Sequence, residues 1–254
     1  MRLAVLSDIH GNLLALEAVL AEIAAQGESD AYWVLGDLAV FGPWPNETVE
    51  RLRGLPRARF LQGNTDRYLT TGEHPPLPGG QAKDPQSWKG VAEALRIRDA
   101  NFQWTVEQLN YEGYRFLHDL QLQIEEEIPD FGYLLAFHAS PLSDEAGIYE
   151  ETSDEELGTY LRGSEARIFL CGHTHRPLSR KIDSSHILNV GSVGLPLDGD
   201  QRAAYLLLDL RGEGYSFHLR RVEYNVQAVI DQLEAIGHPA RNWVAPRLKG
   251  AGAG

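Results

Sequence analysis

Two histidines stand two positions apart in Gly172-His173-Thr174-His175, directly after the apolar run at residues 168–171. On an extended backbone, side chains two positions apart project to the same side. Neutral imidazole is the commonest metal-ligating side chain in proteins. The spacing therefore predicts a metal-binding site at the end of a buried strand, although a pair of histidines alone is weak evidence for one.

The same pattern, an apolar run that ends in polar side chains, occurs four more times. These runs end at Ser7-Asp8-Ile9-His10-Gly11-Asn12, at Gly36-Asp37, at Gly63-Asn64-Thr65-Asp66 and at His138-Ala139-Ser140-Pro141. Ligands of α/β proteins bind beyond the carboxyl ends of the strands, where side chains from several strands can converge. Taken singly, each histidine also suits a protein core, and each aspartate suits a turn or a helix cap. Their repeated position after strands favours one shared site.

In this order the motifs resemble the signature of the calcineurin-like dinuclear metallophosphoesterases. That signature is D-x-H, then G-D, then G-N-H-[DE], then a lone His and finally G-H-x-H. The matching segments here are Asp8-Ile9-His10, Gly36-Asp37, Gly63-Asn64-Thr65-Asp66, His138 and Gly172-His173-Thr174-His175. Residues 189–196, with the sequence NVGSVGLP, are also similar to the small prokaryotic, phosphodiesterase-like branch of that family.

The resemblance implies a hydrolase with two metal ions as cofactors. One ion would be held by Asp8, His10, Asp37 and His175, and the other by Asp37, Asn64, His138 and His173, so that Asp37 bridges the pair. Mixed carboxylate, imidazole and amide ligands suit Mn, Fe or Zn better than Mg or Ca. A hydroxide that bridges the ions would attack phosphorus in line. The implied catalytic residues are Asp37, Asn64, Asp66 and His138, with Asp66 an orienting partner rather than a ligand.

Thr65 stands where most relatives carry the histidine of G-N-H-[DE]. In many relatives that histidine stabilises the transition state or protonates the leaving group, and a threonine hydroxyl is not a useful acid near neutral pH. Leaving groups that depart without a proton are therefore favoured. Asn12 and Arg67 lie beside the metal motifs and are candidate substrate contacts. The alternatives are a helix N-cap for Asn12 and a surface ion pair for Arg67.

These observations predict metal-dependent cleavage of a phosphodiester or a nucleotide phosphoanhydride, with a dinucleoside polyphosphate hydrolase as one candidate. Two alternatives remain: a protein phosphatase of the same fold, and a non-catalytic metal-binding scaffold. Protein phosphatases resemble G-D-x-V-D-R-G after the second strand, whereas residues 36–42 here read GDLAVFG. Retention of every expected ligand argues against the scaffold.

Composition narrows the setting and the partners. A formal net charge of -13 argues against binding to duplex nucleic acid or an anionic membrane, but not against a small phosphorylated substrate such as a nucleotide. No segment is apolar enough for a membrane span, and Met1-Arg2 leads directly into a predicted strand with no room for a signal peptide. The single cysteine, Cys171, cannot form an internal disulfide. We therefore expect a cytoplasmic enzyme; the sequence leaves its oligomeric state open.

The elements that must position these residues can be read from the hydrophobic pattern. Strands are expected at residues 3–6, 31–35, 59–61, 133–137 and 168–171, with helices at 13–24 and 47–52 between the first three. A helical insertion is expected at about 67–130, with a Pro- and Gly-rich loop at 72–85 and helices at 86–98, 101–110 and 112–120. We expect substrate choice to lie in this insertion, whose aromatic residues include Tyr68, Trp88, Phe102 and Tyr111, although helix packing is the alternative role for them.

After His175 the chain has closely spaced strands at 178–182, 186–190, 203–209 and 215–222, which predict a second, largely antiparallel sheet. A final helix at 226–236 and a mobile Gly/Ala tail would follow. The resemblance implies that residues 1–254 form a single α/β domain. Its expected architecture is a four-layer α/β/β/α sandwich of two mixed sheets, with the metal site at the C-terminal ends of the strands.

Overall fold

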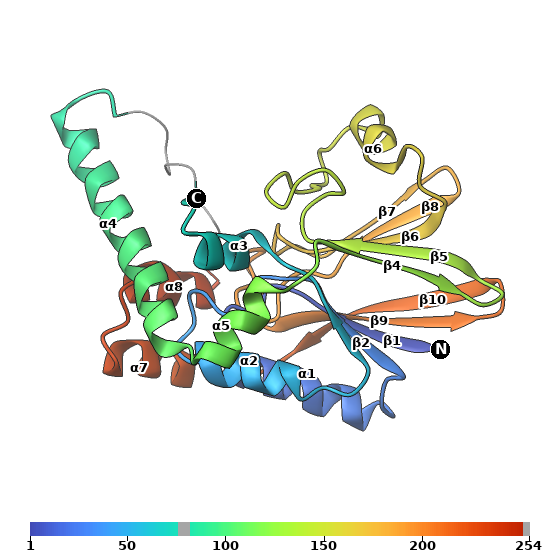
Figure 1. Cartoon of the computed structure of the whole chain (residues 1–254), viewed down its shortest axis with the longest axis horizontal. Helices are drawn as coiled ribbons and strands as arrows, with labels where there is room; N and C mark the ends of the chain where they lie inside the picture. Colours follow the sequence, from blue (N-terminus) through green and yellow to red (C-terminus); the bar gives the residue numbers. More distant parts are fainter. Residues whose placement is uncertain (76–81, 251–254) are drawn as a thin grey trace.

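The chain forms two five-stranded mixed sheets flanked by helices, in a computed structural model that describes residues 1–75 and 82–250 (Figure 1). The first sheet has the spatial order β10 (Gly214–Val222), β9 (Ala203–Arg211), β1 (Arg2–Leu6), β2 (Ala31–Val34), β3 (Ala58–Phe60). The second has the order β4 (Gln123–Ile128), β5 (Gly132–Phe137), β6 (Ala166–Cys171), β8 (Ser185–Asn189), β7 (Leu178–Ile182). The helices are α1 (Leu13–Ala25), α2 (Pro45–Arg53), α3 (Asn64–Thr71), α4 (Pro85–Gln108), α5 (Tyr111–His118), α6 (Asp154–Leu161), α7 (Val226–Ala235) and α8 (Arg241–Leu248).

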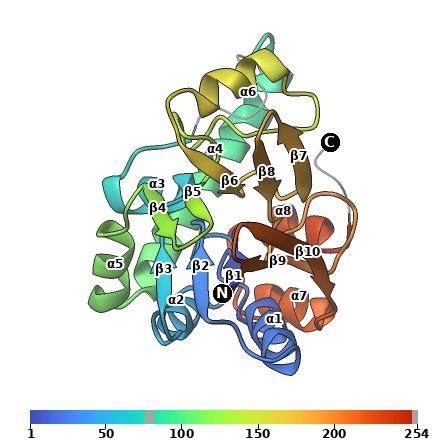
Figure 2. The same cartoon turned by 90° about the vertical axis from the view of Figure 1, so that its right-hand side faces the viewer.

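The two sheets pack face to face, with helices on both outer sides (Figure 2). Side chains of both sheets, among them Val5, Trp33, Leu134 and Leu170, meet in one buried core between them. A second core lies between the first sheet and α1, α2 and their neighbours, and a third lies beneath α6 on the second sheet. The expected α/β sandwich of two mixed sheets is therefore confirmed.

Parallel strands bring the motif-bearing ends together. Strand β1 pairs in parallel with β2, and β2 with β3, so their carboxyl ends reach the same edge of the first sheet. Strands β5 and β6 are also parallel neighbours in the second sheet. Both are nearly continuous apolar runs, as expected for strands that are covered on both faces.

The expectation of a second, largely antiparallel sheet built from the last four strands is wrong. Strands β9 and β10 form an antiparallel hairpin that joins the first sheet through the β9–β1 pairing. Strands β7 and β8 join the other sheet, where β8 pairs in parallel with β6. Hairpin spacing shows which strands pair locally, but it does not show which sheet edge accepts the hairpin.

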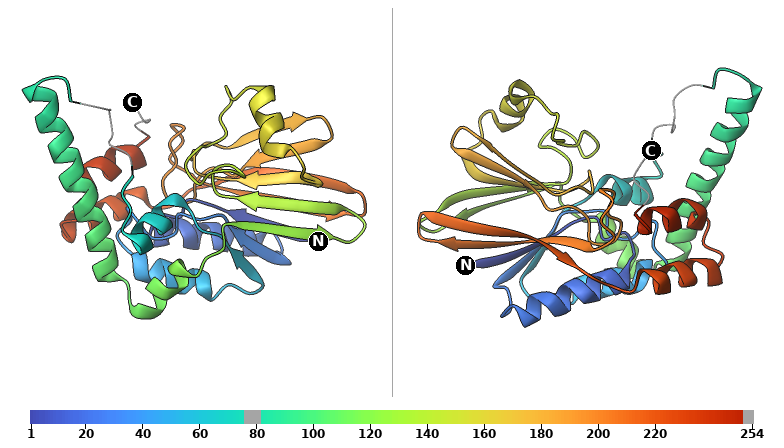
Figure 3. Two further views of the ribbon diagram at one scale, coloured as in Figure 1. Left: turned by 45° about the horizontal axis from the view of Figure 1, so that its top comes forward. Right: turned by 180° about the vertical axis from the view of Figure 1, so that it is seen from behind.

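The helical region between β3 and β4 also differs from expectation. Residues 85–108 form the single helix α4 instead of two helices, and its N-terminal half stands away from the body of the molecule (Figure 3). Helix α8 was not predicted, because its sequence RNWVAPRL has a proline inside it and little apolar periodicity. Part of the loop expected at 72–85, and the Gly/Ala tail at 251–254, lie outside the described residues.

Polar side chains cap several helices as their sequence suggests. Asn12 accepts the Ala15 N–H at the start of α1, and Ser153 accepts the Glu156 N–H at the start of α6. Among the described residues, no helix combines the length and apolarity that crossing a bilayer requires.

The core between the sheets gives a stability prediction. Leu170 is fully buried there, so Leu170→Ala should lower the free energy of unfolding by about 2–5 kcal/mol through lost burial and the cavity left behind. Leu142 is 72% exposed, so Leu142→Ala should change it by less than about 0.5 kcal/mol. Urea titration followed by circular dichroism measures both; equal effects would contradict the assigned core.

Candidate metal centre

Five of the seven metal-ligand candidates lie on loops with an unusual backbone, whereas Asn64 begins α3 and His138 directly follows β5. Asp8, His10, Asp37, His173 and His175 all have positive φ, between 52° and 65°. This left-handed region is uncommon for residues other than glycine and is typical of functional sites held by the surrounding structure. The reason given above for the convergence of His173 and His175, alternation along an extended backbone, is therefore wrong: β6 ends at Cys171, and both residues lie in a strained loop.

Hydrogen bonds between neighbouring loops hold this backbone in place. The Asp8 N–H donates to the Gly36 carbonyl at 3.0 Å, and the His10 N–H donates to the Asp37 carbonyl at 2.9 Å. The two sheets are also linked directly, because the His173 N–H donates to Asp8 Oδ2 at 2.9 Å. The site is therefore built from loops of both sheets, and hydrogen bonds between these loops hold them in position.

Four buried side chains form the first cluster: Asp8, His10, Asp37 and His175. One ligand atom from each lies within 4.8 Å of all the others. His175 Nε2 is 3.2 Å from Asp8 Oδ1, and His10 Nε2 is 3.7 Å from Asp37 Oδ2. These are the residues that the resemblance assigned to one metal ion.

The donor set of this cluster fits a cation. His10 Nδ1 lies 3.0 Å from the Val40 carbonyl, and His175 Nδ1 is bonded to the Leu195 carbonyl. A carbonyl oxygen only accepts hydrogen bonds, so each imidazole, when neutral, carries its proton on Nδ1. Its Nε2 then presents a lone pair to the other side chains of the cluster. The two Nε2 atoms are 3.2 Å apart, and the buried Asp8 Oδ1 has no hydrogen-bond partner. Only positive charge among them, a proton or a metal ion, relieves this repulsion.

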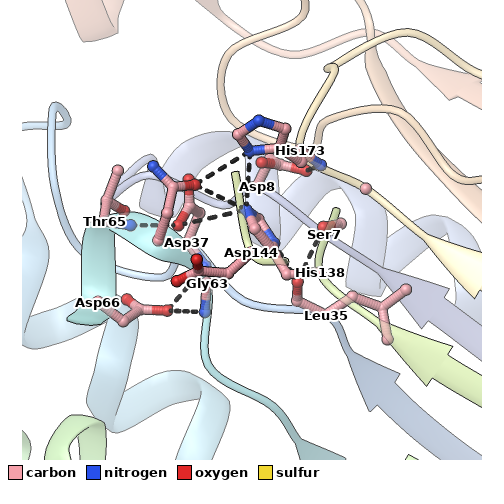
Figure 4. A network of polar contacts seen from close by, with 12 residues as sticks. Ser7, Asp8, Leu35, Asp37, Gly63, Thr65, Asp66, His138, Asp144 and His173 are labelled. Carbon is pink, nitrogen blue, oxygen red and sulfur yellow. Dashed lines mark hydrogen bonds and ion pairs between the residues drawn. The ribbon is translucent and has the colours of Figure 1, made fainter. Parts of the chain in front are cut away.

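A second group of donors lies on the other side of Asp37 (Figure 4). Asn64 Oδ1 is 3.0 Å from both His138 Nε2 and His173 Nδ1. His138 Nε2 is 3.6 Å from Asp37 Oδ1, and its Nδ1 lies 2.7 Å from the Leu35 carbonyl. Asp37 thus stands between the two groups, with Oδ1 toward His138 and Oδ2 toward His10.

The electrostatics of the cluster favour bound positive charge. Burial lowers the pKa of His10 to about 4. Burial also opposes charge at His138 and His175, but the carboxylates of Asp37 and Asp8 outweigh it and raise the pKa of both imidazoles. The imidazoles in turn, His175 foremost, outweigh burial at Asp8 and hold its pKa far below the ordinary value.

Asp66 lies next to the cluster and orders two of its loops. Its carboxylate accepts the N–H groups of Asp37 at 2.8 Å, Leu38 at 3.0 Å and Gly63 at 3.0 Å. Burial, and then the Asp37 carboxylate, raise the pKa of Asp66 to about 7. Glycine is required at 63 because a Cβ there would lie 2.2 Å from Asp37 Oδ1.

The two candidate substrate contacts are engaged elsewhere. Asn12 caps α1 through its carbonyl oxygen, while its amide nitrogen donates to the Gly194 carbonyl at 2.9 Å. The Arg67 guanidinium bonds Asp144, Glu145 and Glu73. The alternatives named above, a helix cap and an ion pair, describe the observed contacts of both residues.

A cavity of about 190 Å³ opens on the cluster and is lined by His10, Asp37, Asn64, Thr65, His173 and His175. Phe41 and Trp243 also line it, and sequence reasoning missed both. Neither carries a motif, and Trp243 lies on the unpredicted helix α8. Of the aromatic residues expected near the site, Tyr68 and Phe102 line the cavity, whereas Trp88 and Tyr111 are exposed.

Comparisons with known proteins agree with this geometry. Residues 1–213 match the family model described as "Calcineurin-like phosphoesterase superfamily domain". An uncharacterized protein of Methanocaldococcus jannaschii is 29% identical over 97% of this chain and 96% of its own length. The crystal structure of a metallophosphoesterase from Sphaerobacter thermophilus is similar with a TM-score of 0.75 and 28% identity over 98% of each chain. A symmetrical bis(5'-nucleosyl)-tetraphosphatase of Hamiltonella defensa is 26% identical over 84% of this chain and 66% of that protein.

The raised pKa values give a prediction for metal binding. Imidazole ligates a metal only when neutral, so Mn²⁺ must displace the protons that Asp8 and Asp37 stabilise on His175 and His138. The affinity for Mn²⁺ should therefore rise, with release of protons, as the pH increases through the pKa values of these imidazoles, which lie above the ordinary 6.5. Calorimetry in two buffers of different ionisation enthalpy measures both. An affinity independent of pH, with no proton release, would contradict this account of the site.

Proposed function

The chain belongs to the calcineurin-like phosphoesterase superfamily, and from this premise we propose that it is a metal-dependent hydrolase of phosphodiesters or nucleotide phosphoanhydrides. The observation that carries the proposal is the pair of buried donor groups on either side of Asp37, beside a cavity. A non-catalytic scaffold has no need of a strained, buried cluster that only positive charge neutralises.

We assign two metal ions to these groups, with Mn, Fe or Zn suited to their mixed donors. Asp8, His10, Asp37 and His175 would hold one, and Asp37, Asn64, His138 and His173 the other. Bound there, two divalent ions supply activation of water and neutralisation of charge on the phosphoryl group, for attack in line. The protein's own task is to fix the donors: backbone carbonyls orient His10, His138 and His175.

Thr65 determines which bonds are suitable. Its N–H donates to Asp37 Oδ1 at 2.9 Å, which helps to place that carboxylate. Its buried hydroxyl has no partner among the described residues and stands where an acid would otherwise serve the leaving group. A hydroxyl can donate a hydrogen bond but does not release a proton near neutral pH. Phosphate and aryl oxide leave without one, which favours anhydrides and activated diesters over alkyl monoesters.

The substrate that we propose is a small phosphorylated molecule, with a nucleotide as the leading candidate. The similarity to symmetrical bis(5'-nucleosyl)-tetraphosphatases supports a nucleotide anhydride. The acidic net charge of -13 disfavours duplex nucleic acid and anionic membranes as partners, because both are bound through clusters of Lys and Arg. The same composition, with one buried cysteine, supports a cytoplasmic setting.

Removal of the shared ligand should abolish hydrolysis. We expect Asp37→Ala and His138→Ala each to lower the turnover of bis(p-nitrophenyl) phosphate with Mn²⁺ by more than roughly 100-fold. Loss of a residue that only hydrogen-bonds to a metal ligand costs about 10- to 100-fold, and loss of the ligand itself should cost more. His118 is exposed, and Asp119 is its one side-chain partner among the residues that the structure describes, so His118→Ala is the matched control and should retain turnover. Turnover that survives both substitutions at the cluster would overturn the enzyme proposal.

The missing acid gives a second expectation. With Mn²⁺, an aryl phosphodiester such as bis(p-nitrophenyl) phosphate should be cleaved faster than an alkyl monoester such as glycerol phosphate, because only the alkoxide needs a proton to leave. Initial rates from a p-nitrophenolate assay and a phosphate assay make the comparison. Faster cleavage of the monoester would show that another group supplies the proton.

A further inference from the structure

A larger cavity, of about 480 Å³, adjoins the metal centre. One wall is a single face of α4, formed by Gly90, Ala94, Ile97 and Asn101 at intervals of three or four residues. The facing wall includes Ala240 and Trp243, which lie at the start of α8. The volume falls within the range of about 300–1,000 Å³ that is usual for small-molecule sites.

This cavity borders the one at the metal centre. Phe41, Arg98 and Trp243 line both cavities. The rings of Phe41 and Trp243 stack with their centroids 4.9 Å apart. Another ring neighbour of Phe41 is His10, whose ring centroid lies 5.4 Å from that of Phe41. An apolar aromatic wall therefore runs from a metal-centre histidine into the larger cavity.

Three polar residues, Glu93, Arg98 and Asn101, interrupt the apolar lining of this cavity, and Asn101 differs from the other two in being fully buried. Neither its amide oxygen nor its amide nitrogen has a hydrogen-bond partner among the described residues. Leaving both halves of a buried amide unpaired is costly, and native proteins rarely do so without a functional reason. The amide lies beneath the cavity surface, and a ligand group that both accepts and donates would satisfy it once the side chain turns toward the cavity.

We propose that this cavity binds the heterocyclic base of a nucleotide substrate whose phosphate reaches the metal centre. This inference rests on the proposed function and specifies its substrate. Two features point to a base rather than an alkyl chain: the aromatic Phe41–Trp243 wall and the unpaired amide of Asn101. An asparagine amide pairs with adenine through one acceptor and one donor, N7 and N6, which favours a purine.

The test compares two ligands that differ only in the base. Adenosine 5'-monophosphate and ribose 5-phosphate share the sugar and the phosphate, so calorimetric titration of each in the presence of Mn²⁺ isolates the contribution of adenine. We expect adenosine 5'-monophosphate to bind at least about tenfold more tightly, the scale of contacts between a base and aromatic side chains. Equal affinities for the two ligands would overturn the base subsite.

Two tryptophan substitutions on α4 form a matched pair. Ala94 lines the cavity, and Ala94→Trp should fill it and reduce the base-dependent gain to less than about threefold. Ala92 is on the same helix, has comparable intermediate exposure and does not line the cavity, so Ala92→Trp should retain the full gain. Loss of the gain in both variants, or in neither, would contradict the placement of the base.

Asn101→Leu tests the amide separately from the fold. It should weaken binding of adenosine 5'-monophosphate and leave ribose 5-phosphate unchanged, while the Tm stays the same or rises because an unpaired buried amide has been removed. A lowered Tm with equal loss of affinity for both ligands would show a purely structural amide and overturn its role.

Turnover of bis(p-nitrophenyl) phosphate is assayed in parallel. Base-dependent binding without turnover would refute the hydrolase, and turnover without base dependence would refute only the subsite.

Discussion

The structure is organised around a buried cluster of carboxylates and imidazoles whose lone pairs repel one another unless a positive charge lies among them. Asp8 and Asp37 are almost fully buried with four imidazoles around them, and no lysine or arginine lines their cavity apart from Arg98 within the described residues. In a hydrophobic core, unpaired carboxylates would be among the most costly groups to bury. The carboxylates raise the pKa of His138 and His175, which favours a proton there in the metal-free protein, and a bound cation would offset the same cost. The suitability of the cluster for a metal ion thus follows from how the two sheets bury their strand ends.

Holding these groups together requires a backbone that most sequences avoid. Five of the seven candidate ligand residues take left-handed conformations, and hydrogen bonds between neighbouring loops hold them in place. Asp66 and Gly63 show how closely the loops fit: one carboxylate accepts three N–H groups, and a single added carbon at 63 would collide with Asp37. Strain of this kind persists only where the surrounding structure overdetermines it. The face-to-face sheets, joined by the bond from His173 to Asp8, provide that surrounding.

Sequence reasoning reached every described strand except β4, which lies in the region assigned to a helical insertion, because apolar runs are local patterns. The polar ends of those runs indicated the gathering of Asp8, His10, Asp37 and His175, whereas the two mixed sheets were implied by the family resemblance. Sequence reasoning did not assign the last hairpins to the correct sheets. Strand β9 pairs with β1, about two hundred residues earlier in the chain, and the sequence of β9 alone does not indicate which strand it pairs with. Sequence reasoning also gave the wrong reason for the His173–His175 pair, because a left-handed loop leaves no periodic trace. Helix α8 escaped it for a similar reason: its contacts are tertiary, and a proline interrupts its pattern.

The proposed base subsite is formed by α4 and α8, the two helices that the sequence did not predict correctly. Metal ligands must be few residue types at fixed positions, so they are visible as motifs, whereas a wall for an organic group needs only shape and apolarity. Helices α4 and α8 meet that looser requirement, and they lie outside the two sheets. In the proposed function, Thr65 on α3 would restrict the bond that can break, and Asn101 on α4 would restrict the group that can be held beside it. Chemistry and recognition would then rest on different elements of the fold.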